Sequence, residues 1–287
     1  MSAQEPCYVI TGGRPLRGAV AVSGSKNAAL YALAAGLLAS DTLTLTNVPR
    51  IADIEEMAEI LRALGARVEI EGETVRIATP AVASTAPPAE LVVRLRASFL
   101  VMGPLLARCG EAELTPPGGD VIGRRRLDTH FLALEQLGAV HEFGDRIRFT
   151  TKGLVGADIF LDEPSVTGTE NAIMAAVAAK GTTVLHNAAC EPHVQDLANF
   201  LVTLGAQIDG IGTNRLIIDG DQVVQPFSAT ATHSAEFMGL PASGRKFKIE
   251  GARLHVMKDG RIQEEQRIYD FTGLLIQVGV LKSKPAV

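Results

Sequence analysis

Residues 23–27 hold the first side chains whose types and spacing could do chemistry. They read Ser-Gly-Ser-Lys-Asn and directly precede an Ala- and Leu-rich stretch that is typical of a helix. The first turn of a helix has free backbone N–H groups and the positive end of its dipole. Because Lys26 adds a cation beside the Asn27 amide, this segment could cradle a phosphate. The spacing is not that of a Walker A loop, and a plain helix cap with a solvated Lys26 is the competing interpretation.

A glycine-rich loop carries the second group of candidates. Residues 116–123 contain three glycines and two prolines, and arginines follow at 124–126. Loops of this composition often close over a substrate. Asp120 is the one acid among these glycines and is a candidate for proton transfer, with the capping of a turn as the alternative. Arg96, at the start of another predicted helix, supplies a further cation.

An internal repeat must position these residues. The tripeptide Leu-Gly-Ala occurs three times, at 64–66, 137–139 and 204–206. Its glycine is a typical helix end, and the intervals between copies exceed those of solenoid repeats. Each copy is therefore a whole supersecondary unit. The units are expected at about 22–80, 91–150 and 158–220.

Every unit is predicted to fold in the same order, βαβαββ or nearly so. First helices are expected at about 26–39, 97–108 and 169–179, and strands after them at 42–46, 111–115 and 182–187. Each second helix shows one apolar face. That face comprises Ile54, Met57, Leu61 and Leu64 in the first unit and Val194, Leu197, Leu201 and Leu204 in the third. Hairpins close the units across 68–77, 140–149 and 207–218.

The repeats predict the fold class. Three such units bury their helices most economically by packing them against one another, with the sheets outside. We therefore expect an α/β (α+β) protein whose main domain spans 22–220, preceded by an N-terminal strand segment at 1–21.

Composition narrows the function classes. The chain has 287 residues, is 47% hydrophobic and carries a net charge of -5, which argues against nucleic acid as a partner. Its three cysteines, Cys7, Cys109 and Cys190, are far apart and fit a reducing compartment. The apolar run 28–39 is shorter than the roughly 20 residues of a membrane span, and the first residues lack signal-peptide features. We expect a cytoplasmic protein with no membrane contact.

Several motifs together resemble one family. They are Gly24-Ser25-Lys26-Asn27-Ala28-Ala29, Arg96-Ala97-Ser98, Pro117-Gly118-Gly119, Ile122-Gly123, Leu127-Asp128 and Asn187-Ala188-Ala189-Cys190-Glu191-Pro192. Over about residues 8–220 the chain resembles UDP-N-acetylglucosamine enolpyruvyl transferase (1-carboxyvinyltransferase), of the EPSP synthase-like family. The resemblance implies one domain of an inside-out α/β barrel. Substrates of that family bind in a cleft between two such domains, under the glycine-rich lid.

The resemblance also implies roles for single residues. Catalytic roles around phosphoenolpyruvate fall on Asp120, Lys26, Arg96 and Arg125. Contacts to UDP-N-acetylglucosamine fall on Asn27, Leu127, Asp128, Ser165 and Thr167. Asp120 stands where most members have a lid cysteine and a minority have aspartate. The epoxide antibiotic fosfomycin, which alkylates that thiol, is therefore expected to form no adduct at this position.

The implied reaction is a step of peptidoglycan synthesis. The 3'-hydroxyl of UDP-N-acetylglucosamine adds to the enol carbon of phosphoenolpyruvate, and the tetrahedral ketal then eliminates phosphate. A carboxyl with a raised pKa, such as Asp120, could give the proton to the methylene carbon. Since proton transfer and anion stabilisation suffice, the resemblance implies no metal and no organic cofactor.

The last part of the chain, 230–287, resembles the second half of a SnoaL-like polyketide cyclase, a cone-like α+β fold of the nuclear transport factor 2 type. Strands are predicted at 246–250, 254–257 and 261–269. Residues 221–229 are expected to be a linker. Asp270 matches an acid of that family's pocket, yet half a cone is expected to enclose none. The alternative is a leftover sheet that pairs with a second copy or covers an edge.

Two function classes remain open at this point. The first is an enolpyruvyl transferase whose cleft is completed by a partner chain or a second copy, because the family's second domain is not found in the sequence. The second is a non-catalytic sugar-nucleotide-binding domain whose tail mediates association. A further alternative is that the tail is only a fragment of a SnoaL-like cyclase. Only the first class predicts release of phosphate from phosphoenolpyruvate.

Overall fold

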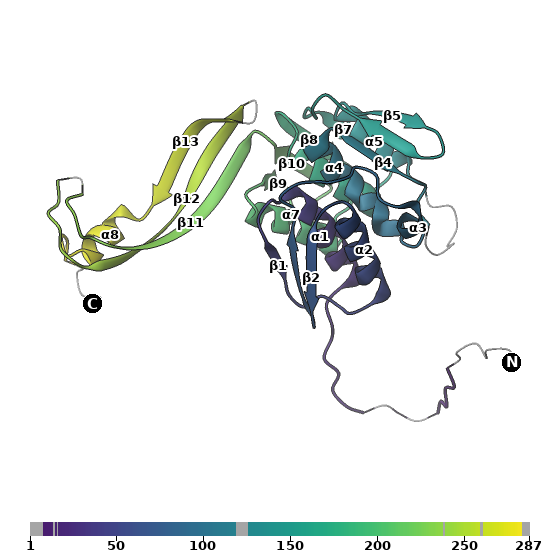
Figure 1. The fold of residues 1–287 in the computed structure, drawn as a ribbon, viewed down its shortest axis with the longest axis horizontal. Coiled ribbons are helices and arrows are strands. Elements are labelled where there is room, and N and C mark those ends of the chain that lie inside the picture. The colour runs from purple at the N-terminus through teal and green to yellow at the C-terminus, as the bar shows by residue number, and fades with distance from the viewer. Residues whose placement is uncertain are drawn as a thin grey trace.

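The computed structural model describes residues 8–13, 15, 17–118, 126–237, 239–258 and 261–282. Three repeated units form one body, and a long three-stranded sheet extends from it (Figure 1). Among the described residues, no helix is long and apolar enough to cross a bilayer.

The first unit contains two helices and a three-stranded antiparallel sheet. Helix α1 (Lys26–Ala35) continues into a 3-10 turn, η1 (Gly36–Leu38), and is followed by β1 (Leu43–Leu45) and α2 (Ala52–Ala63). The hairpin of β2 (Arg67–Glu71) and β3 (Thr74–Ala78) then completes a sheet of order β1-β3-β2. The predicted face of α2 is confirmed, because Ile54, Met57, Leu61 and Leu64 are all fully buried.

The second unit repeats this order of elements, with additional short helices before its first long helix. A short helix, α3 (Ala89–Val92), leads to the 3-10 helix η2 (Arg96–Val101), α4 (Met102–Cys109) and β4 (Glu111–Leu114). Helix α5 (Asp128–Gln136) and the hairpin of β5 (Val140–Phe143) and β6 (Ile147–Thr150) follow, and the sheet order is β4-β6-β5.

The third unit has an additional strand before its first helix. Its elements are β7 (Asp158–Phe160), α6 (Val166–Ala176), β8 (Thr182–His186), α7 (Pro192–Thr203), β9 (Gln207–Asp209) and β10 (Arg215–Asp219). Strand β7 pairs in parallel with β8, giving the order β7-β8-β10-β9. The complete βαβαββ pattern is therefore present here, whereas no strand precedes the first helix in the described parts of the other two units. The predicted face of α7 is buried at Val194, Leu197 and Leu201, but Leu204 is 38% exposed.

The helices of the three units pack against one another and the sheets lie outside, as predicted. Helix α1 contacts α2, α7 and η2, and α6 contacts α4, α5 and α7. Polar groups also join the units. The Arg108 guanidinium donates to the carbonyls of Leu37 and Thr79 at 2.7 Å each, which ties the second unit to the first.

The N-terminal strand predicted within 1–21 is absent from the described residues of that segment. Its apolar side chains, such as Val9 at 90% and Val20 at 91%, are exposed. A strand needs a neighbour for its backbone hydrogen bonds, and none of the sheets includes described residues of this segment.

The C-terminal part differs from the predicted linker and three short strands. Residues 221–229 lie almost wholly in β11 (Gln222–Thr232), an edge strand paired along its whole length with β12 (Lys246–Lys258). Strand β12 joins the two strands predicted at 246–250 and 254–257, and β13 (Arg261–Tyr269) and α8 (Phe271–Gln277) complete the unit. Pro226 is compatible with β11 because an edge strand has one row of unpaired groups.

Candidate functional site

One cavity of about 370 Å³ lies where helix starts from the three units meet. Its lining residues come from α1, α2, the segment before η2, η2 itself, α6 and α7. They are Lys26, Asn27, Leu30, Asp53, Arg94, Leu95, Arg96, Ala97, Leu100, Val166, Thr167, Glu170 and His193. Four predicted site residues, Lys26, Asn27, Arg96 and Thr167, are thus brought together from three repeats.

Lys26 is the first residue of α1 and reaches the cavity beside Asn27. Ser25 caps the helix, since its hydroxyl accepts from the Ala28 N–H at 3.4 Å. The Lys26 ammonium is also paired, because Nζ lies 2.9 Å from Oδ2 of Asp53 on α2. Both interpretations of this segment are therefore compatible with the structure. Ser25 caps α1, and Lys26, the first residue of that helix, lines the cavity.

Arg96 is the first residue of η2 and also lines the cavity. One of its guanidinium nitrogens, Nη2, donates to the backbone carbonyl of Arg126 at 3.2 Å. Arg96 therefore links the cavity wall to the chain just after the glycine-rich loop.

Leu127 and Asp128, two of the predicted UDP-N-acetylglucosamine contacts, are not among the residues that line the cavity. Leu127 is the residue before α5 and Asp128 is the first residue of that helix. The Arg126 guanidinium donates to Asp128 Oδ2 at 2.6 Å and lies 3.8 Å from Oδ2 of Asp162. Both Arg126 and Asp128 are half exposed, so this ion pair fixes side-chain direction more than it stabilises the fold.

Of the predicted pair Ser165 and Thr167, the first caps a helix and the second lines the cavity. The Ser165 hydroxyl accepts from the Gly168 N–H at 3.2 Å and is the N-cap of α6. Thr167, two residues on, lines the cavity. Asp120 and Arg125 lie outside the described residues.

The beginning of the glycine-rich loop is held tightly against the body. Gly118 lies so close to Val93 that a Cβ atom on this glycine would be 1.6 Å from the Val93 carbonyl oxygen. Val93 immediately precedes the cavity residue Arg94. The loop therefore departs from the rim of the cavity.

Glu170 and His193 line the cavity and were not predicted from the sequence. The Glu170 side chain on α6 is 3% exposed, and His193 Nε2 on α7 lies 4.0 Å from its Oε1 atom. Burial, and secondarily the charge of Glu191, raise the pKa of Glu170 to about 8. With this pKa, Glu170 is a neutral acid at neutral pH in the wall of the cavity that Lys26 also lines. The available signal was that Glu170 is the one acid in a helix of small and apolar residues.

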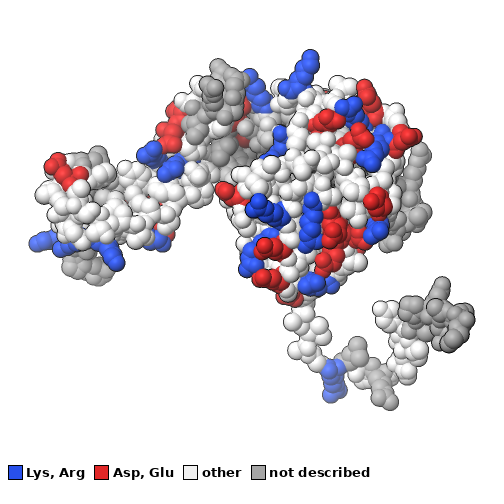
Figure 2. Space-filling model, viewed as in Figure 1, with Lys and Arg blue, Asp and Glu red and all other residues white. Residues whose placement is uncertain are grey.

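The face of the three-unit body visible in Figure 2 is not uniformly basic. Figure 2 shows acidic and basic side chains interspersed over the visible face of the three-unit body. Among the residues that the structure describes, no group of three or more His, Cys, Asp or Glu side chains is arranged to hold a metal ion.

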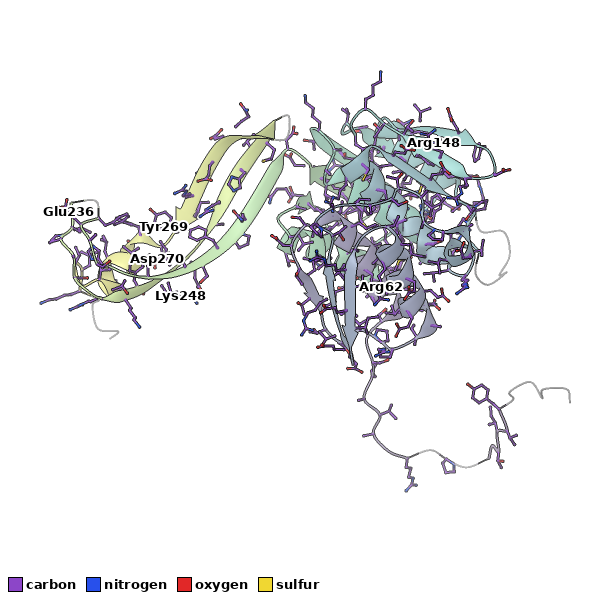
Figure 3. The ribbon with its side chains drawn as sticks, viewed as in Figure 1. Arg62, Arg148, Glu236, Lys248, Tyr269 and Asp270 are labelled. Carbon is purple, nitrogen blue, oxygen red and sulfur yellow. The ribbon has the colours of Figure 1, made fainter. Side chains whose placement is uncertain are left out.

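A second cavity, of about 410 Å³, lies between the C-terminal sheet and α8. Its walls include Phe227, Phe247, Tyr269 and Leu274. A pocket is thus present where half a cone was expected to enclose none, because α8 folds back over the sheet. Asp270 is not among its lining residues: at the end of β13 its carboxylate caps α8, accepting from the Gly273 N–H at 2.7 Å (Figure 3).

Comparison with known proteins extends these observations. The family model of EPSP synthase (3-phosphoshikimate 1-carboxyvinyltransferase) matches residues 10–239, and that of SnoaL-like polyketide cyclase matches residues 210–278. A UDP-N-acetylglucosamine 1-carboxyvinyltransferase of Bradyrhizobium diazoefficiens is 59% identical over 214 residues, 74% of this chain and 50% of that protein. The enzyme of the same name from Borreliella burgdorferi is 44% identical over 253 residues, 88% of this chain and 58% of that protein.

Solved structures agree with the fold. The enolpyruvyl transferase NikO from Streptomyces tendae superposes with a TM-score of 0.63 at 27% identity, covering 72% of this chain and 49% of that chain. EPSP synthase from Acinetobacter baumannii gives a TM-score of 0.57 at 20% identity, over 70% of this chain and 46% of that chain. The chain spans about half the length of the curated relatives it matches. With a family model covering most of its residues and a relative at 59% identity, the chain belongs to the EPSP synthase (3-phosphoshikimate 1-carboxyvinyltransferase) family.

Proposed function

We propose that residues 22–220 form one wall of the active site of a UDP-N-acetylglucosamine 1-carboxyvinyltransferase, which binds UDP-N-acetylglucosamine and phosphoenolpyruvate. One observation carries the proposal: Lys26, Asn27, Arg96 and Thr167, from three different repeats, line a single cavity. The names of the curated relatives support the choice of sugar nucleotide.

The charges of the cavity suit the second substrate. Phosphoenolpyruvate carries a carboxylate and a phosphate, for which a guanidinium fork and an ammonium are suitable partners. Arg96 and Lys26 supply these groups, and Arg125 would add a second fork from the loop. Positive charge fixed in place stabilises the charge that develops on the departing phosphate.

Apart from the C–O bonds that form and break at C2 of phosphoenolpyruvate, the reaction needs only proton transfers. The sugar 3'-hydroxyl gives its proton to a base that the proposed partner wall supplies, and its oxygen bonds to C2 of phosphoenolpyruvate. At the same time C3 takes a proton from Asp120 and becomes a methyl group, which leaves Asp120 as a carboxylate. In the second step the C2–phosphate bond breaks and the methyl group returns a proton, which restores the double bond. We assign the proton at C3 to Asp120 because the loop that carries it begins at the cavity rim, beside Val93.

The proposal includes a partner for the opposite wall. The chain corresponds to about half of its relatives, so we propose that a second chain or a second copy completes the cleft. We also propose a cytoplasmic location, which the free thiols of Cys109 and Cys190 support because they fit a reducing compartment. The pathway would be peptidoglycan synthesis.

The decisive experiment is phosphate release with both substrates present, compared between the wild-type chain and Lys26→Ala. Release that requires both substrates and is lost in the variant supports the transferase. The half-length match also favours a second candidate, a sugar-nucleotide-binding domain without catalysis. For that candidate, UDP-N-acetylglucosamine should raise the melting temperature while no phosphate appears. If neither signal is seen with the intact chain, both candidates are wrong.

A further inference from the structure

We propose that His130 and Asn171 are positioning residues that make the Thr167 hydroxyl a fixed hydrogen-bond donor to a phosphoryl oxygen in the cavity. The proposal rests on the proposed function, because it assigns a task within the same site. It is carried by a chain of hydrogen bonds from the core to the cavity, and each link fixes the direction of the next.

The first link fixes the amide of Asn171, which is fully buried in α6. Its Oδ1 atom accepts from the Gly103 N–H at 2.8 Å, and its Nδ2 atom donates to the Phe99 carbonyl at 2.8 Å. A flipped amide would set N–H against N–H and oxygen against oxygen. The two backbone partners therefore determine the orientation of the side chain.

The second link fixes the tautomer of His130, which is 2% exposed. The Nδ2 atom of Asn171 also lies 3.0 Å from Nδ1 of His130, and an amide nitrogen can only donate. Nδ1 must therefore accept, so the proton of the neutral ring is on Nε2. Burial and the nearby Arg96 charge lower the pKa of His130 to about 3, which keeps the ring neutral across the physiological range.

The third link determines the direction of the Thr167 hydroxyl. His130 Nε2 lies 3.0 Å from Thr167 Oγ1 and donates to it. The threonine proton must then go to another acceptor, and no described residue accepts it. Since Thr167 lines the cavity, this proton is available to a ligand there.

The surroundings determine which acceptor fits. Lys26 and Arg96 line the same cavity and favour an anion. A phosphoryl oxygen carries charge and only accepts, so it matches a hydroxyl that can only donate. Such oxygens occur in the diphosphate of the sugar nucleotide and in phosphoenolpyruvate, and separate titrations distinguish the two.

The test combines binding and the state of the imidazole. Calorimetry would measure UDP-N-acetylglucosamine alone, and phosphoenolpyruvate with the nucleotide present, on the wild type, Thr167→Val and Thr167→Ser. We expect Thr167→Val to weaken one of the two at least about tenfold, as for a lost bond to a charged group, and Thr167→Ser to retain affinity. Thr183→Val is the matched control, because Thr183 is buried, lacks a partner for its hydroxyl and lies outside the cavity wall.

A second readout does not depend on any variant. Nitrogen-15 NMR of the wild type should show His130 as the neutral Nε2–H tautomer between pH 5 and 8. An Nδ1–H tautomer or a protonated ring would overturn the proposal, as would equal affinity of Thr167→Val and wild type for both ligands. If the wild type binds neither ligand, the proposed function fails, while the tautomer still reports on the hydrogen-bond chain.

Discussion

The ammonium of Lys26 and the carboxylate of Asp53 meet at 2.9 Å on the wall of the cavity, from the first turns of two neighbouring helices. Their side chains are 51% and 36% exposed, and pairs this open to water contribute about 1 kcal/mol or less to stability. Asp53 therefore matters mainly for the site: it orients Lys26, and its charge opposes an anion that approaches the same ammonium.

Asp53→Asn should therefore strengthen anion binding severalfold, because the repulsion is removed while an amide can still orient Lys26. Calorimetric titration with phosphoenolpyruvate at low salt would measure this, and urea unfolding should shift by less than about 1 kcal/mol. Glu55→Gln is the matched control, since Glu55 lies on the same helix as Asp53 and is also ion-paired, with Arg50, but does not line the cavity. Equal gains in both variants would show that net charge alone is responsible.

Glu170 should make the wild type lose stability as pH rises. Its pKa is about 8 in the fold against an ordinary value of 4.5. Between these values the unfolded chain has released a proton that the folded chain keeps, so the free energy of unfolding falls with increasing pH, by up to about 1.4 kcal/mol per unit. Below pH 4.5 this penalty is absent, and above pH 8 it is complete.

Glu170→Gln removes this dependence because the amide stays neutral. Urea unfolding at pH 5, 6.5 and 8 should show the variant gaining on the wild type at each step, with exposed Glu90→Gln as the control. Parallel profiles for wild type and Glu170→Gln would mean that Glu170 is ionised in the folded state at neutral pH.

Gly24 should not tolerate a side chain. A Cβ atom there would lie 1.7 Å from the carbonyl oxygen of Asn47, so the start of α1 would have to move. We expect Gly24→Ala to cost roughly 1–3 kcal/mol of stability and to weaken anion binding by displacing Lys26. Gly144→Ala is the control, because its nearest neighbour would be 3.8 Å away. A Gly24→Ala variant with wild-type stability and affinity would contradict the tight contact.

Local patterns predicted much of this architecture. The spacing of apolar residues in α2 and α7 indicates which face of each helix is buried, and the hairpins depend on turns of a few residues. Both features could therefore be predicted without tertiary information. Strand β11 could not be read in this way. Pro226 and small polar residues are typical of a linker, and only pairing with β12 makes this segment a strand.

Only part of the site could be predicted, because local sequence patterns mark some of its residues and not others. Lys26 and Arg96 stand at helix starts, where the sequence itself marks a candidate. The positions of Glu170 and His193, and the hydrogen bond between His130 and Thr167, depend on contacts between different repeats. The spacing of residues within one repeat does not indicate such contacts. The roles of Asp120 and Arg125 stay predictions, since both lie outside the described residues.

The aspartate at the lid position gives the last prediction: fosfomycin should leave Asp120 unmodified. The epoxide is opened by a thiolate, and a carboxyl is a much poorer nucleophile. The tryptic peptide that holds Asp120 also begins with Cys109, so fragment ions must locate any mass shift. Loss of water around the Cys109 thiol raises its pKa, which keeps it protonated and slow to react. Asp120→Cys is the positive control and should become alkylated when UDP-N-acetylglucosamine is bound. A wild-type adduct on Asp120, or an unreactive Asp120→Cys, would show that this position does not face the reacting carbon.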